Sequence, residues 1–201
     1  LGIPVQIILL SSSLSTANDT IPSAYDWGNF ADRSTHYHNI ETLHRHNERT
    51  DSTHAYDAIA YNLDIQLFHE SQLINGFLEM EFVSLVDGLE IVELHLAALD
   101  FSNVMFNGTS VNANRINDLI TVDISGMPMG LNENATLSLQ YAGTPWTGNN
   151  LGLFFTQNVA YTLSDPWGTR NWVPCYDEPF DKALWSINVR AASTHKSLSN
   201  G

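Results

Sequence analysis

The stretch Tyr61-Asn62-Leu63-Asp64-Ile65-Gln66-Leu67-Phe68 places an apolar residue at every second position. Such alternation predicts a β-strand that buries one face in a core and turns the other toward solvent. A hairpin is expected to follow, with its turn either near 69–72 or at Asn75-Gly76. The alternation resumes from Phe77 to Val83. The two runs therefore predict a pair of neighbouring antiparallel strands.

Downstream, further short apolar runs are separated by residues that favour turns. Asp87-Gly88 and Asn107-Gly108 are turn dipeptides, and the second is the strongest hairpin signal in the chain. The expected strands are 91–96, 119–124, 135–141, 151–156, 159–163 and 183–191. No convincing amphipathic helix interrupts them. Short strands with frequent turns predict an all-β fold, an antiparallel β-sandwich or a saddle-like pair of sheets.

Composition limits the classes of partner. The 201 residues are 43% hydrophobic, which is enough for a sizeable core. Asp and Glu number 22 against eight Lys and Arg, so the formal net charge is -14. This charge repels the phosphates of nucleic acids, and we expect no nucleic-acid partner. The single cysteine, Cys175, excludes an internal disulfide framework.

The first 54 residues differ from the remainder of the chain. Residues 1–17 combine a short apolar run with a small-residue region, which predicts the truncated signal peptide of a secreted protein. The run is too short for a membrane span, which needs about 20 apolar residues. The alternative interpretation is a buried first strand. Export also fits the sequons at Asn18, Asn107 and Asn134. Residues 18–54 are polar and without periodicity, and they predict a leader on the surface.

Histidines in this leader invite a metal-site interpretation. The candidate ligands are four histidines and one carboxylate, namely His36, His38, His44, His46 and Glu48. Imidazoles and carboxylates bind divalent ions, but no pair of His here has the spacing of one helical turn with a Glu between them. We therefore favour a solvated His-rich linker. His69-Glu70 opens like a zinc-protease helix, but Leu73 stands where the second His belongs. No metal site is predicted in this chain.

Chemistry-bearing residues concentrate between Tyr161 and Lys182. This segment holds the only cysteine, three prolines, two tryptophans and four carboxylates. Its centre, from Arg170 to Pro179, reads Arg-Asn-Trp-Val-Pro-Cys-Tyr-Asp-Glu-Pro, and 181–183 add Asp-Lys-Ala. This pattern resembles the signature near the end of the amino-terminal domain of M1-family zinc aminopeptidases. The residues that carry the signature are Arg170, Trp172, Pro174, Cys175, Asp177, Glu178 and Pro179.

The resemblance covers residues 55–201, and what it implies is a saddle-like β domain that caps a thermolysin-like zinc domain. In that family, a loop presents a Gln or Glu to the free amino group of the peptide substrate, ten residues before the signature Cys. The corresponding residue is Asp165, which is one methylene shorter. A carboxylate there can hold an ammonium group through charge-assisted hydrogen bonds. Asp165-Pro166 is also a good turn initiator, and we expect a turn that carries the ligand.

The cysteine and the two adjacent carboxylates of the signature each suggest a catalytic role. Cys175 could be a nucleophile, but no His lies nearby in sequence, and a buried structural role is favoured. Asp177 and Glu178 could form an acid/base pair. We instead expect them to cap backbone amides or to pair with Arg170 around a turn bounded by prolines.

The resemblance also implies partners that lie outside these residues. The family binds zinc through His-Glu-x-x-His and a distant Glu in its catalytic domain, and the present sequence contains no such motif. We expect a fragment that is inactive alone and that works with the catalytic domain of the same chain on peptides with a free N-terminus. Two alternatives remain. One is a non-catalytic interaction module, and the other is a secreted carbohydrate-binding sandwich that uses Trp146, Trp167 or Trp172.

Overall fold

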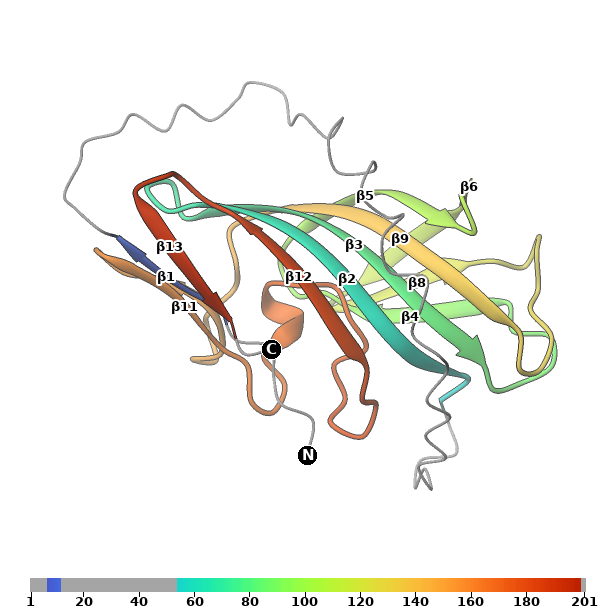
Figure 1. Ribbon diagram of the computed structural model, residues 1–201. Helices are drawn as coiled ribbons and strands as arrows, with labels where there is room; N and C mark the ends of the chain where they lie inside the picture. The colour runs from blue at the N-terminus through green and yellow to red at the C-terminus, as the bar shows by residue number, and fades with distance from the viewer. Residues whose placement is uncertain (1–6, 12–53, 200–201) are drawn as a thin grey trace.

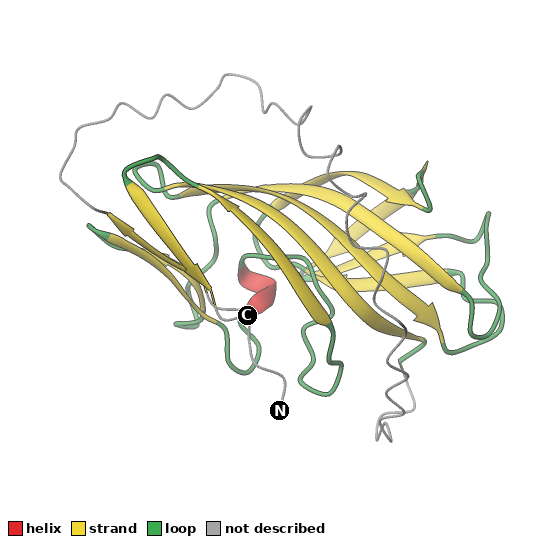
Figure 2. Cartoon of the chain, viewed as in Figure 1, coloured by secondary structure: helices red, strands yellow, loops and turns green. Residues whose placement is uncertain are grey.

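The computed structural model describes residues 7–11 and 54–199, which form strands and one short 3-10 helix, η2 (Thr169–Asn171) (Figures 1 and 2). The strands are β1 (Ile7–Ser11), β2 (Tyr56–Phe68), β3 (Leu73–Ser84), β4 (Ile91–His95), β5 (Asp100–Phe106), β6 (Thr109–Ser110), β7 (Asn112–Ile116), β8 (Leu119–Asp123), β9 (Asn134–Gly143), β10 (Gly152–Phe155), β11 (Val159–Leu163), β12 (Leu184–Arg190) and β13 (His195–Ser199).

The strands form three sheets. The largest has the order β12-β2-β3-β9-β5-β6, the second β4-β8-β7 and the third β10-β11-β1-β13. Figure 1 shows β2, β3 and β9 as long, curved neighbours in the largest sheet. The pairs are antiparallel, except that β12 runs parallel to β2. The expected all-β, sandwich-like fold is confirmed, and it comprises three sheets rather than a single pair.

The alternating stretch at the start of the domain lies in β2 and pairs along its length with β3. Leu63 and Ile65 are buried, as their positions in the alternation require. The turn between the strands lies at 69–72, where the amide of Gln72 donates to the carbonyl of His69 at 3.3 Å. The other expected turn, Asn75-Gly76, instead lies within β3.

Gly76 has a packing role in that strand. The ring of Tyr141, from the neighbouring strand β9, lies directly over its backbone. A Cβ atom at this position would be 2.1 Å from the ring, which no side chain tolerates. A glycine in the interior of a strand thus marks a close approach and not a turn.

The expected hairpin at Asn107-Gly108 is confirmed. These two residues join β5 to β6, and both have positive φ, 47° and 77°. Asparagine and glycine adopt this left-handed conformation more readily than other residues. A similar tight connection, with Asn117 at a φ of 58°, joins β7 to β8 and positions Asp118.

One hydrophobic core unites the sheets. The six-stranded sheet contributes residues such as Leu78 and Leu137, and the three-stranded sheet contributes Val92 and Ile120, all fully buried. The same cluster includes Trp172 from the signature segment, which has no exposed surface. The segment is therefore part of the core that holds the sandwich together.

The backbone of Ile7–Ser11 forms β1 between β11 and β13. The sequence allowed two interpretations of this segment, a truncated signal peptide or a first strand. The structure shows a strand, and export remains a prediction. The leader residues 18–53, with the sequon at Asn18 and all five candidate metal ligands between 36 and 48, lie outside the described residues. The last leader residue, His54, stacks on Tyr176 with 3.6 Å between ring centroids.

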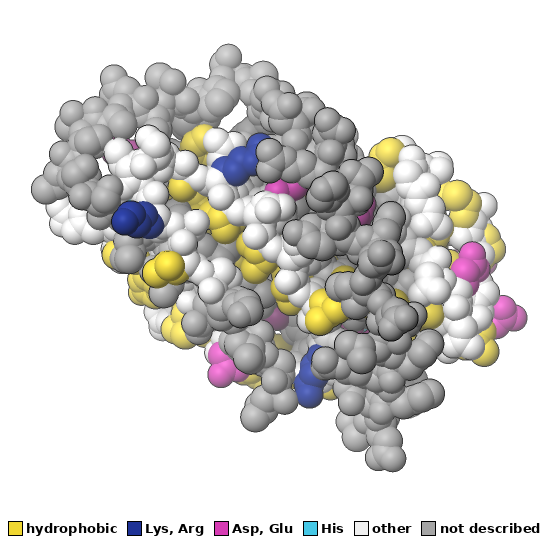
Figure 3. All heavy atoms as spheres, in the orientation of Figure 1, with side chains coloured by type: hydrophobic (Ala, Val, Ile, Leu, Met, Phe, Trp, Pro, Cys, Tyr) yellow, Lys and Arg dark blue, Asp and Glu magenta, His cyan; other side chains and the backbone are white. Residues whose placement is uncertain are grey.

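The described surface carries few positive charges. On the face drawn in Figure 3, Lys and Arg side chains are isolated spots and do not form a patch. A basic patch is the usual footprint of a nucleic-acid-binding surface. In the part of the chain that the structure describes, no helix has both the length and the apolar character to cross a membrane.

Candidate functional site

The signature segment is attached to two other parts of the chain, residues 95–97 and Trp146, by backbone hydrogen bonds. Cys175 and His95 exchange two bonds, of 2.7 and 3.1 Å, so the segment extends the edge of β4. The carbonyl of Arg170 accepts from Ala97 at 2.8 Å, and that of Asn171 accepts from Trp146 at 3.1 Å. These bonds hold the backbone of the segment in place at Arg170, Asn171 and Cys175.

Trp172 anchors the segment in the core. Its indole Nε1 donates to the hydroxyl of Ser164 at 3.0 Å, and both side chains are buried. A buried indole N–H needs such a partner, because an unsatisfied donor is costly. The burial of Trp172 rules it out as a platform for sugars, since none of its surface is accessible.

Arg170 connects three carboxylates. Its Nε donates to Asp177 at 3.0 Å, its Nη1 to Asp118 at 3.1 Å and its Nη2 to Glu178 at 3.4 Å. Asp177 is buried and also accepts from the backbone amide of Arg170 at 3.1 Å. The expected pairing of Asp177 and Glu178 with Arg170 is thus confirmed. Burial opposes ionisation of Asp118, but the hydrogen bond and charge of Arg170 outweigh it and lower the pKa of that carboxyl.

Cys175 has no features of a nucleophile. Its side chain is buried, and burial followed by the charge of Asp177 raises the pKa of the thiol well above its ordinary value. Only a thiolate is nucleophilic. Cys175 therefore acts as a small buried side chain, in agreement with the structural role expected for it.

His95 lies beside this network in its neutral form. Its Nδ1 accepts a hydrogen bond from the amide of Asp177 at 3.2 Å, so the proton of the neutral ring belongs on Nε2. Burial, and then the charge of Arg170, lower the pKa of His95. A protonated ring would lose the acceptor for Asp177 and would face a guanidinium.

This arrangement predicts a loss of stability in mild acid. Because the folded-state pKa of His95 is lowered, its contribution is complete above the ordinary value of about 6.5 and is lost as pH falls below it. His95→Asn keeps an acceptor for the Asp177 amide but does not titrate. Its midpoint of urea unfolding should therefore change less between about pH 7 and about pH 5. Equal changes in both proteins would contradict the assignment.

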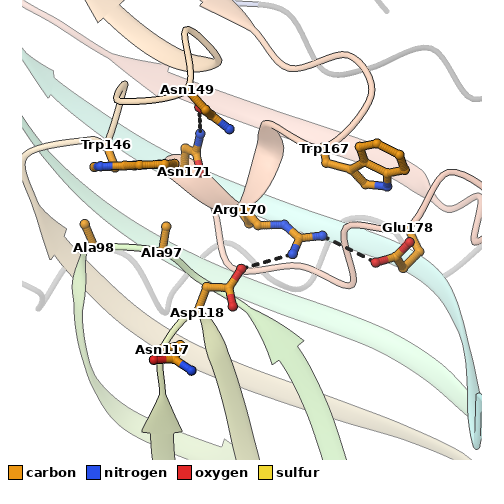
Figure 4. A pocket seen from close by; sticks show the side chains of 10 residues that line it. All are labelled: Ala97, Ala98, Asn117, Asp118, Trp146, Asn149, Trp167, Arg170, Asn171 and Glu178. Atoms are coloured by element: carbon orange, nitrogen blue, oxygen red, sulfur yellow. Dashed lines mark hydrogen bonds and ion pairs between the residues drawn. The ribbon is translucent and has the colours of Figure 1, made fainter.

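A pocket of about 690 Å³ opens beside Arg170 (Figure 4). It is bounded by the turn before β8, the loop before β10, the turn before η2 and the signature segment. The lining residues are Ala97, Ala98, Asn117, Asp118, Trp146, Asn149, Trp167, Arg170, Asn171 and Glu178. Trp146 and Trp167 are exposed, so only these two of the three candidate sugar platforms are accessible.

Asp165 lies at the exposed end of the turn that leads into η2. The preceding residue, Ser164, is buried and accepts both from Trp172 and, through its carbonyl, from the amide of Gly168 at 2.8 Å. The Asp165–Pro166 peptide bond is cis. The expected turn is confirmed. Asp165 does not line the pocket, but Trp167 of the same turn does.

Sequence reasoning missed Asp118, which the structure brings to Arg170 from 52 residues away. The available signal was Asn117-Asp118, two turn-forming residues between polar and apolar runs. Among the described residues, no group of three His, Cys, Asp or Glu side chains can hold a metal ion.

Fold and site together define an all-β domain with a proline-bounded signature segment whose centre is buried in the core. Residues 57–201 match the model of the Peptidase M1 N-terminal domain. The chain belongs to the M1 peptidase family. A comparison with curated proteins found no match.

Solved structures of M1 enzymes share the fold. The M1 zinc metallopeptidase from Deinococcus radiodurans superposes with a TM-score of 0.64 at 23% identity, over 72% of this chain and 38% of that one. A mutant of it bound to a Tyr-Ser-Ala substrate gives the same values. Yeast LTA4 hydrolase in complex with bestatin has a TM-score of 0.57 at 16% identity, over 69% of this chain and 23% of that chain. The chain thus spans 38% of the length of the Deinococcus structures.

Proposed function

We propose that this domain is the substrate-channel cap of a secreted zinc aminopeptidase, where it recognises the free amino group of the peptide. The observation that carries the proposal is the turn at Asp165. Asp165 is exposed, and a hydrogen bond from the amide of Gly168 to the carbonyl of the buried Ser164 closes the turn that carries it. A turn whose backbone is already held in place loses less conformational entropy when its side chain binds an ammonium group.

Family membership supports the rest of the proposal. The similar structures are zinc metallopeptidases, and one of them holds a peptide. Because the described residues offer no zinc site, zinc and its ligands would belong to a catalytic domain elsewhere in the protein. The contribution of this chain is to bind and orient the substrate amine. Secretion is proposed from the signal-like composition of residues 1–17, of which Ile7–Ser11 forms β1 in the structure.

Asp165→Ala in the full-length enzyme is expected to lower kcat/KM for substrates with a free N-terminus by at least tenfold. A charge-assisted hydrogen bond contributes about 1.5 to 3 kcal/mol, and tenfold corresponds to about 1.4 kcal/mol. Asp165→Glu should retain most of the activity, because it keeps the carboxylate. The measurement is release of an aminoacyl arylamide.

The matched control is Glu90→Ala, which removes an exposed carboxylate outside the turn and the pocket. It should leave kcat/KM unchanged. An Asp165→Ala enzyme with full activity would remove Asp165 from amine recognition. A full-length reading frame without His-Glu-x-x-His would instead favour the non-catalytic interaction module.

The chain alone is expected to release no arylamine, with or without added zinc. The reason is that it contains neither the His-Glu-x-x-His motif nor a described metal site. The measurement is arylamide turnover at increasing zinc concentration, with a chelator as the control. Zinc-dependent turnover that the chelator abolishes would overturn the assignment of catalysis to another domain.

A further inference from the structure

Two exposed tryptophans face the pocket beside Arg170. Trp146 is 44% exposed and Trp167 is 51% exposed. Figure 4 shows them on opposite sides of Arg170, on two separate loops. Large aromatic side chains gain free energy when their surface is covered. Two exposed tryptophans that line one pocket therefore indicate a ligand-binding surface.

The walls of the pocket are held in place by contacts within the domain. The indole of Trp146 lies over Gly148, where a Cβ atom would be 2.7 Å from the ring. The side chain of Asn171 donates to Asn149 and to the carbonyl of Leu151, both at 3.0 Å. These contacts position the loop that carries Trp146 against η2. The pocket is therefore preformed, which lowers the cost of binding.

The charge of the pocket is negative. Arg170 supplies its one cationic side chain, and three carboxylates surround that guanidinium. Asp177 is buried beneath it, whereas Asp118 and Glu178 line the pocket with side chains 45% and 31% exposed. His95 adds no positive charge at neutral pH, since its pKa is lowered. Around Arg170, carboxylates outnumber guanidinium groups by two.

We propose that this pocket binds an organic cation, a guanidinium or ammonium group that contacts Trp146 or Trp167, with Asp118 and Glu178 as counter-charges. Indole faces attract cations, and carboxylates form charge-assisted hydrogen bonds with them. The identity of the cation rests on the proposed function: it is a Lys or Arg side chain of a peptide substrate. It is distinct from the N-terminal amine that is assigned to Asp165.

The charges also favour a cation over other occupants. A neutral sugar could stack on the tryptophans but would gain nothing from the excess negative charge. An apolar partner surface would bury Asp118 and Glu178, whose two negative charges share a single guanidinium. At least one of these charges would then be buried without compensation, and desolvation of unpaired carboxylates is costly. A cation gains from the aromatic rings and from the carboxylates together.

Titration of the chain with Nα-acetyl-L-arginine amide tests the proposal against its uncharged isostere, Nα-acetyl-L-citrulline amide. Tryptophan fluorescence and the NMR shifts of the indole N–H groups report binding. We expect the arginine compound to bind at least about fivefold more tightly, and more weakly as salt is added. Neither compound has a free α-amino group, so the result does not depend on the role of Asp165.

Variants locate the site. Asp118→Asn and Glu178→Gln should each weaken binding of the arginine compound about threefold, and Trp167→Ala about fivefold. Glu90→Gln and Leu131→Ala are the matched controls, because each removes an exposed side chain away from the pocket. Both should bind as the parent chain does. If Asp118→Asn does not fold, Glu178→Gln carries the test of charge.

Three results would overturn the proposal. The first is equal affinity for the arginine and citrulline compounds, and the second is tighter binding of the neutral sugar chitotriose. The third is no binding of either amide. Such a result would not affect the proposed role of Asp165 in amine recognition, because the aminopeptidase test uses free-amine substrates and a different residue.

Discussion

Trp172→Ala is expected to destabilise the domain by about 4 kcal/mol. The side chain is fully buried in the core shared by the sheets, so its removal leaves a cavity. It also leaves the buried hydroxyl of Ser164 without its indole donor. The midpoint of urea unfolding, followed by far-UV circular dichroism, measures the loss.

Two further variants separate the causes. Trp172→Phe keeps most of the volume but lacks the N–H, and it should cost about 1 to 2 kcal/mol for the unsatisfied Ser164 and the smaller ring. Trp167→Ala is the matched control, because that tryptophan is 51% exposed, and its effect should stay within about 0.5 kcal/mol. A Trp172→Ala protein as stable as the control would mean that the segment does not belong to the core.

Arg170→Met is expected to cost about 3 kcal/mol, which is the lower end of the range for breaking a buried ion pair. The guanidinium side chain is 17% exposed and its partner Asp177 is 7% exposed. Methionine fills the space but leaves the Asp177 carboxylate buried without its counter-charge. The free energy of urea unfolding at neutral pH provides the measurement.

The double variant Arg170→Met with Asp177→Asn should recover part of this loss, because the buried carboxylate is then neutral. Arg170→Lys should be intermediate, since one ammonium group cannot reproduce a planar fork that reaches three carboxylates. Lys196→Met removes an exposed positive charge and controls for the change in net charge. Equal losses in Arg170→Met and Lys196→Met would show that the ion-pair network contributes nothing.

Most strands could be predicted because their side chains alternate between a buried and an exposed face. The range 159–163 agrees with β11 residue for residue, and 119–124 differs from β8 by one residue at its end. Two of the strands that went unpredicted, β7 and β13, lack this signal. Asn112–Ile116 contains no fully buried residue, and four of the five residues of β13 are exposed. Periodicity reports burial, so an exposed edge strand is invisible to it.

Part of the candidate site could be predicted as well. The signature residues and the turn at Asp165 are contiguous in sequence, and a local pattern is enough to find them. The pocket is not contiguous. Asp118 reaches Arg170 from the hairpin turn between β7 and β8, and Trp146 is placed by a hydrogen bond to Asn171. Such neighbours depend on long-range packing, which no local window contains.

By itself, the sequence determined the all-β class, the principal hairpins and the signature that marks the M1 family, because each depends on alternation, turn chemistry or a short motif. Only the tertiary structure decided which tryptophans are accessible. Trp167 and Trp172 are five residues apart in one segment, yet one lines a pocket and the other is fully buried. The difference arises from the fold, since η2 turns the chain between them and directs one indole to solvent and the other onto Ser164.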